Sequence, residues 1–161
     1  MIVVPDAGPL IYLAGAGHLS LLVRLFDRVV VPRSVYDEVV IAGAGLMGSA
    51  EVAAATWLEV SAVVPDPSLA LSLDLGEAAA IPLAARLGAI LLCDDASGRT
   101  EATRRGIPVI GTFGVLLQAK RGGLLDHIRP VIENMRAAGL YASQALVREL
   151  LVAAGEDQAP G

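Results

Sequence analysis

The sequence predicts an α/β fold in which a central parallel β-sheet is flanked by helices on both faces. Short apolar runs rich in β-branched residues alternate with segments of helical periodicity along the chain. The run at residues 89–93 is apolar throughout, as expected of a strand that is buried on both faces of a parallel sheet. The 161 residues suit one domain. We expect this domain to span residues 1–156 and to end in a disordered tail at 157–161.

The predicted elements alternate in chain order. We expect strands near residues 1–5, 28–31, 89–93 and 107–110, with a further strand region at 57–64. The helices expected around them lie at residues 9–17, 19–26, 34–40, 50–57, 68–73, 76–87, 97–105, 113–123, 126–139 and 143–156. Ser34 and Asp37 have the spacing of a helix N-cap and its reciprocal partner. Pro82 should kink its helix or mark two joined turns.

Composition excludes several classes of protein. The longest stretch without a charged residue runs from Ala7 to Val23, is interrupted by proline and glycine, and falls short of a membrane span. The single cysteine, Cys93, excludes a disulfide framework and fits a reducing, cytoplasmic compartment. A net charge of −5 argues against a protein that coats nucleic acid by charge alone. Because the mean hydropathy is +0.63, we expect the apolar surplus to be covered in a homodimer.

Acidic residues are placed where the predicted fold would bring them together. Asp6 follows the first strand and Asp95 follows the strand at 89–93, and the carboxyl ends of parallel strands form the ligand-binding edge of an open sheet. Glu38 and Glu77 each lie early in a predicted helix. Four carboxylates at one edge repel one another unless hard cations such as Mg²⁺ or Mn²⁺ lie among them. Such a cluster can activate water for phosphodiester cleavage.

Structural roles for the same acids stay open at this point. Asp74 stands three residues before Glu77, which is the spacing of an N-cap and its partner. Asp95 is placed to cap the helix that follows it. The alternative for the whole chain is therefore a catalytically inactive binding module in which the acids are helix caps.

A glycine-rich segment supplies a second alternative. Gly43, Gly45 and Gly48 form the pattern G-x-G-x-x-G, and Asp66 follows 18 residues after the last glycine, which imitates a dinucleotide-binding fingerprint. That fingerprint requires a buried strand before the first glycine, whereas here a predicted helix precedes it. We therefore interpret the segment as a helix end and a loop, and expect no dinucleotide binding there.

The order and spacing of five segments resemble a known family. The segments are VVPDAGPLIYLAGAGHL, VPRSVYDEVV, WLEV, LDLGEAAAIPLAARLGAILLCDDASGR and GIPVIGTFGVLLQAKRGGL, which together cover most of the chain. They resemble the PIN-domain ribonucleases, in the VapC-like toxin branch with extra C-terminal helices. The resemblance implies a PIN-like fold and a Mg²⁺- or Mn²⁺-dependent ribonuclease that cleaves single-stranded RNA. It also implies a small antitoxin that blocks the site.

The resemblance assigns roles to individual residues. It maps the acids of the family onto Asp6, Glu38, Glu77 and Asp95, and the supporting polar residue onto Thr112; Asp94 is an additional acid beside the site. We expect direct metal ligation by Asp6 and Asp95, at the rigid ends of strands, and water-mediated roles for Glu38 and Glu77. Gly8 departs from the family, many members of which carry Ser or Thr there. Among the basic residues that follow Asp94 and Asp95 in the sequence, Arg99 is expected to bind the RNA backbone.

Overall fold

Five strands form one parallel sheet in the computed structural model, which describes residues 1–158. They are β1 (Ile2–Pro5), β2 (Arg28–Pro32), β3 (Leu58–Ser61), β4 (Ile90–Leu92) and β5 (Val109–Ile110). Their order across the sheet is β3-β2-β1-β4-β5, and each neighbouring pair is parallel. The predicted fold class is confirmed, and a strand lies in each segment where one was predicted.

The chain reverses its direction across the sheet between β1 and β4. It moves outward from β1 through β2 to β3, and then returns to pair β4 with the free side of β1, where Val3 lies opposite Ile90. In open α/β sheets, ligands bind at the carboxyl ends of the strands at such a reversal. The residues that follow β1 and β4 are therefore the ones that this topology marks for function.

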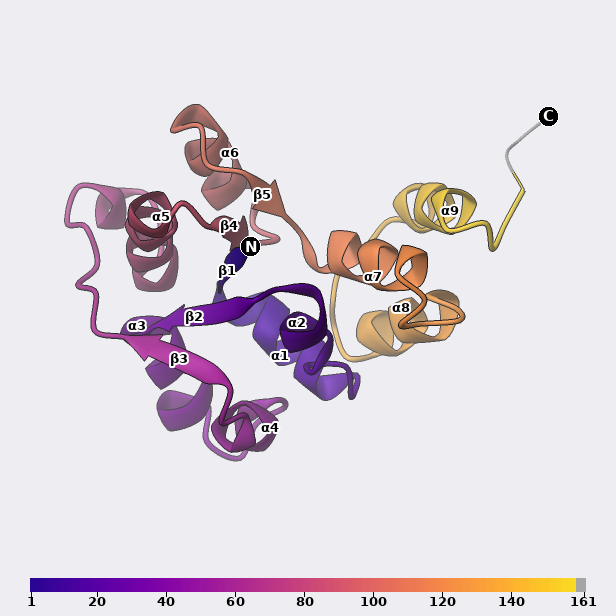
Figure 1. The fold of residues 1–161 in the computed structure, drawn as a ribbon, viewed down its shortest axis with the longest axis horizontal. Coiled ribbons are helices and arrows are strands. Elements are labelled where there is room, and N and C mark those ends of the chain that lie inside the picture. The colour runs from indigo at the N-terminus through magenta and orange to yellow at the C-terminus, as the bar shows by residue number, and fades with distance from the viewer. Residues whose placement is uncertain (159–161) are drawn as a thin grey trace.

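Helices cover both faces of the sheet (Figure 1). They are α1 (Ala7–Gly15), α2 (Leu21–Leu25), α3 (Arg33–Tyr36), α4 (Ser49–Ala54), α5 (Leu75–Leu87), α6 (Ala96–Arg104), α7 (Thr112–Arg121), α8 (Arg129–Ala137) and α9 (Gln144–Ala153), with a π-helical turn η1 (Asp37–Ala42) and a 3₁₀ turn η2 (Leu69–Leu71). None of the helices within residues 1–158 has the length and apolar character needed to cross a membrane.

Alternating strand residues supply two separate cores. Val3 and Leu92 belong to a core that includes buried residues of α1, α2, α7 and α8. Val4, Leu91 and Cys93 belong to a second core that includes residues of α5 and α6. Side chains of successive strand residues point to opposite faces of a sheet, so these two cores are its two faces. The helices α7, α8 and α9 gather away from α5 and α6, as Figure 1 shows.

Two local predictions are corrected by the structure. The helix α3 begins at Arg33, after Pro32, and Ser34 does not cap it; the Ser34 hydroxyl is buried without a hydrogen-bond partner. Pro82 lies inside the uninterrupted helix α5. Proline lacks the N–H that would bond the carbonyl of Ala78, and that carbonyl instead accepts a hydrogen bond from the Asp66 N–H at 2.9 Å. An outside donor thus satisfies the carbonyl that Pro82 cannot bond.

The chain beyond α9 was predicted to be a disordered tail. Asp157 and Gln158 lie outside any helix. Residues 159–161 of that predicted tail lie outside the described residues.

Candidate metal centre

Asp6 occupies the end of the central strand β1. Its backbone N–H donates to the Leu92 carbonyl at 2.9 Å, so the pairing of β1 with β4 extends to this residue. Although Asp6 stands at the N-cap position of α1, its side chain makes no capping hydrogen bond. The side chain is 8% exposed, and its Oδ1 is buried with no hydrogen-bond partner. A buried carboxylate oxygen without a donor is costly, so this atom is poised for a ligand.

The first turn of α5 brings two more carboxylates to this edge. Asp74 caps the helix and accepts a hydrogen bond from the Glu77 N–H at 2.8 Å, as the spacing of these residues predicted. The Glu77 side chain is 4% exposed. Gly76 lies between them, and a Cβ there would stand 2.9 Å from Asp6 Oδ1. The glycine therefore allows the α5 backbone to approach Asp6 closely.

The adjacent acids after β4 have different surroundings. Asp95 caps α6 by accepting hydrogen bonds from Ser97 and Gly98 N–H groups at 3.1 and 3.2 Å. Asp95 also raises the pKa of Asp6 and of Glu77, which places it with the buried acids. Asp94 instead accepts hydrogen bonds from the Thr112 N–H at 2.8 Å and the Thr112 hydroxyl at 2.6 Å. Thr112 thus supports the turn after β4 through Asp94.

Glu38 reaches the cluster from η1 and is exposed. Its carboxylate is close enough to act on Asp6 and to be acted on by Asp74. Together with Asp74 and Gly76 it lines a hollow of about 620 Å³. The structure therefore brings Asp6, Glu38, Glu77 and Asp95 to one edge. Sequence reasoning treated Asp74 only as a helix cap and missed that its charge belongs to the same cluster.

Burial and mutual repulsion raise the pKa values of Asp6, Glu77 and Glu38. Burial raises the pKa of Asp6 to about 7, with further contributions from Asp74, Glu38 and Asp95. Burial, followed by the charges of Asp74 and Asp6, raises the pKa of Glu77 to about 8. The pKa of Glu38 is also raised, by burial and by Asp74. A bound divalent cation offsets both effects, and oxygen donors of this kind suit Mg²⁺ or Mn²⁺.

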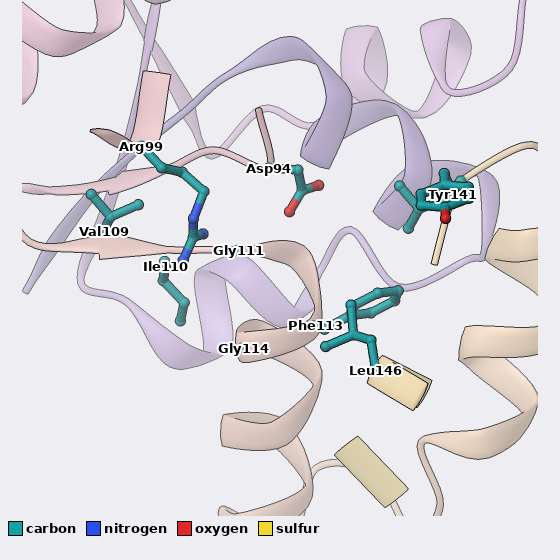
Figure 2. Close-up of a pocket in the computed structure, with 10 residues that line it drawn as sticks. Asp94, Arg99, Val109, Ile110, Gly111, Phe113, Gly114, Tyr141 and Leu146 are labelled. Carbon is teal, nitrogen blue, oxygen red and sulfur yellow. The ribbon is translucent and has the colours of Figure 1, made fainter. Parts of the chain in front are cut away.

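A pocket of about 450 Å³ adjoins the acidic edge. Figure 2 shows Asp94 on one side of it, Phe113 and Leu146 on another, and Tyr141 at its margin. Arg99 also lines the pocket and donates a hydrogen bond to the Cys93 carbonyl at 3.0 Å. Sequence reasoning missed Phe113, Tyr141 and Leu146, because only the packing of α7, of α9 and of the connection before α9 brings them beside β5.

The glycine segment does not have the geometry of a dinucleotide site. Gly43 follows the π-helical turn η1, and Gly48 precedes the short helix α4. The buried strand that the fingerprint requires before its first glycine is replaced here by helical residues.

Comparisons with known proteins agree with the fold. The model of a family described as DUF3368, PIN domain, matches residues 2–156. Among solved structures, the chain is similar to a PilT N-terminus domain protein from the hyperthermophilic archaeon Sulfolobus solfataricus P2. The TM-score is 0.50 at 17% identity, over 74% of this chain and 93% of that one. No curated protein matches significantly. The extent of the family match shows that the chain belongs to the PIN-domain family.

Proposed function

We propose that this PIN-domain protein is a Mg²⁺- or Mn²⁺-dependent endoribonuclease that cleaves single-stranded RNA. The observation that carries the proposal is the buried Oδ1 atom of Asp6, which has no hydrogen-bond partner and lies at the reversal point of the sheet. Four further acids surround or approach it: Glu38, Asp74, Glu77 and Asp95. Their oxygens fit a hard divalent cation, and the family is one whose members are typically nucleases.

We assign different roles to the acids of the cluster according to how rigidly the backbone holds each one. Asp6 and Asp95 would hold the cation, since Asp6 directly follows β1 and Asp95 is fixed as the N-cap of α6 shortly after β4. Glu77, fixed in the first turn of α5, would orient the attacking water, and Glu38 would do so from the exposed side. A bound divalent cation supplies a lowered water pKa and stabilisation of charge on the phosphodiester. Thr112 acts through Asp94 to fix the turn that carries Asp95.

The adjoining pocket supports a single-stranded substrate. Unpaired bases can stack on aromatic rings and on guanidinium groups of a protein. The bases of a duplex are already stacked on one another and cannot do so. Phe113, Tyr141 and Arg99 line the pocket beside Asp94 (Figure 2). Arg99 carries five N–H groups, and the bond to the Cys93 carbonyl uses one of its two terminal nitrogens. We assign it contact with the RNA backbone.

The physiological role that fits this chemistry is the toxin of a toxin–antitoxin pair. A cluster of carboxylates attracts a basic side chain as well as a metal cation, so a small antitoxin with a basic tail would block it. A short neighbouring reading frame that encodes a DNA-binding protein with such a tail would support this role. If no such reading frame exists and no binding partner is recovered from the source organism, the toxin role is refuted. The nuclease proposal would still stand.

The decisive experiment uses Asp95→Asn, because asparagine is nearly isosteric and still caps a helix. We expect a folded protein with a near-normal melting temperature, weakened Mg²⁺ binding and a loss of metal-dependent cleavage of at least about a hundredfold. Asp126→Asn, at an exposed acid outside the cluster, is the matched control and should cleave as the parent does. If Asp95→Asn cleaves a labelled single-stranded RNA with the parent's Mg²⁺ dependence, the site is wrongly assigned. If the parent itself does not cleave, the inactive-module alternative gains support.

A further inference from the structure

A sulfur atom lies among the buried acids. Cys93 follows β4, and its Sγ is 4.0 Å from Asp6 Oδ2 and 3.8 Å from the Asp95 carbonyl oxygen. One ligand atom from each of Asp6, Glu77 and Cys93 lies within 4.8 Å of the other two. All three side chains are buried. Two oxygens and one sulfur thus converge from β1, α5 and β4.

The surroundings of Asp6 and Gly98 indicate that this edge of the core is open to a ligand. Asp6 is 8% exposed, and its buried Oδ1 has no hydrogen-bond partner. The backbone of α6 comes close only because residue 98 is glycine; a Cβ there would stand 3.0 Å from Cys93 Sγ and 3.1 Å from Glu77 Oε1. Because Gly98 has no side chain, there is room for Cys93 Sγ and Glu77 Oε1 beside the α6 backbone.

We propose that Asp6, Glu77 and Cys93 form a site for the thiophilic cation Zn²⁺, with the Cys93 thiolate as the third ligand. Zinc commonly takes three protein ligands and a water, with Zn–S bonds of about 2.3 Å and Zn–O bonds of about 2.1 Å. Two such ligand atoms on a tetrahedral ion lie about 3.6 Å apart. The observed separations of up to 4.8 Å would therefore have to close by at most about 1.2 Å. The thiol proton leaves to solvent when the ion binds.

The sulfur of Cys93 makes the site selective between Zn²⁺ and Mg²⁺. Mg²⁺ is hard and takes oxygen ligands, so the carboxylates alone hold it. Zn²⁺ gains the thiolate and therefore competes with Mg²⁺ for Asp6, and it also occupies Glu77, which would otherwise orient the attacking water. Zinc inhibition of RNA cleavage is the functional consequence. That consequence depends on the proposed nuclease activity, whereas zinc binding itself does not.

Cadmium is the probe, because its thiolate complexes absorb in the ultraviolet and the chain has a single cysteine. Any such absorption therefore reports Cys93. In the full-length protein without RNA, we expect the absorption to saturate with one bound ion. Cys93→Ser should abolish it and weaken Cd²⁺ and Zn²⁺ binding by about tenfold or more, with Mg²⁺ affinity changed by less than about threefold. Asp6→Asn and Glu77→Gln, which keep the cysteine, should weaken the absorption titration, and Glu133→Gln on α8 should not.

Two results would overturn the zinc site. One is no thiolate absorption from the folded parent at Cd²⁺ concentrations that saturate its calorimetric binding. The other is an absorption titration that Asp6→Asn and Glu77→Gln leave unchanged, since the thiol would then bind metal outside the cluster. A separate Mn²⁺-dependent RNA cleavage assay tests the nuclease. If the parent gives the Cd²⁺ absorption but does not cleave RNA, only the nuclease proposal is refuted. If it cleaves RNA but gives no Cd²⁺ absorption, only the zinc-site proposal is refuted.

Discussion

Asp6 and Glu77 retain protons that ordinary carboxyl groups release well below neutral pH. Their pKa values, about 7 and about 8, lie above those of unfolded carboxyl groups, near about 4. Between these values the folded chain binds more protons than the unfolded chain. The free energy of unfolding of the metal-free protein therefore falls as pH rises, by on the order of 1 kcal/mol per pH unit for each group.

Melting curves in a chelator check this prediction. We expect a lower melting temperature at about pH 8 than at about pH 5, and a larger stabilising effect of Mg²⁺ at the higher pH. Asp6→Asn should flatten the pH dependence, because the amide does not titrate. A metal-free protein that becomes more stable over this range would contradict the electrostatic description of the cluster.

Thr112 offers a second prediction at the residue scale. Its hydroxyl donates to Asp94 at 2.6 Å, and the side chain is 1% exposed. Thr112→Val keeps the shape and removes this bond to a charged group, which should cost about 2 kcal/mol of unfolding free energy. Chemical denaturation measures the loss. Thr100→Val, at an exposed threonine on α6, is the control, and an equal loss in both variants would show that Asp94 gains nothing from the hydroxyl.

At the scale of elements, the first turns of α1 and α6 each contain a glycine, and the two positions differ in the space available for a side chain. A Cβ at Gly98 would approach both Cys93 Sγ and Glu77 Oε1, whereas a Cβ at Gly8 would meet nothing within 4 Å. Gly98→Ala should therefore displace these side chains and weaken divalent metal binding by about tenfold or more. Gly8→Ala should bind metal as the parent does. Calorimetric titration compares them, and equal affinities would place the cation away from α6.

The sequence allowed the main elements to be predicted because their signals are local. The strand β4 is an apolar run closed by Asp94 and Asp95, and α5 ends at Gly88, which adopts a left-handed conformation with φ of 61°. The position of Asp6 beside Asp95 followed from the topology of parallel sheets. The hydrogen bond from the Asp66 N–H that compensates for Pro82 is tertiary, and no local pattern contains it.

The pocket beside the acids was not predicted for the same physical reason. Tyr141 lies in the connection between α8 and α9, and its neighbours in the pocket come from α6, β5 and α7. Helical periodicity indicates which face of α9 is apolar, but it does not say against which strand that face packs. The charge of Asp74 was overlooked because the capping pattern already explained the residue.

At the scale of the whole molecule, apolar side chains remain exposed around η1 and the loop before α4. Ile41 and Leu46 are 66% and 71% exposed. We predict that a homodimer covers this region, since patches of this kind mark protein interfaces. Light scattering should give twice the 16.6 kDa chain mass at micromolar concentration, and Leu46→Asp should give the monomer. A monomeric parent would refute the dimer, and a Leu46→Asp dimer would place its interface elsewhere.

The pairing of β1 with β4 has a consequence during synthesis of the chain. Val3 lies opposite Ile90, so the central strand has one unpaired edge until the ribosome has released β4. Asp95 follows that strand in the chain, whereas Asp6 precedes it and is therefore synthesised earlier. Because a domain of this kind folds as a unit, a nascent or prematurely terminated chain that stops before β4 has no assembled acidic centre. The acidic centre therefore assembles only after β4 and Asp95 have been synthesised.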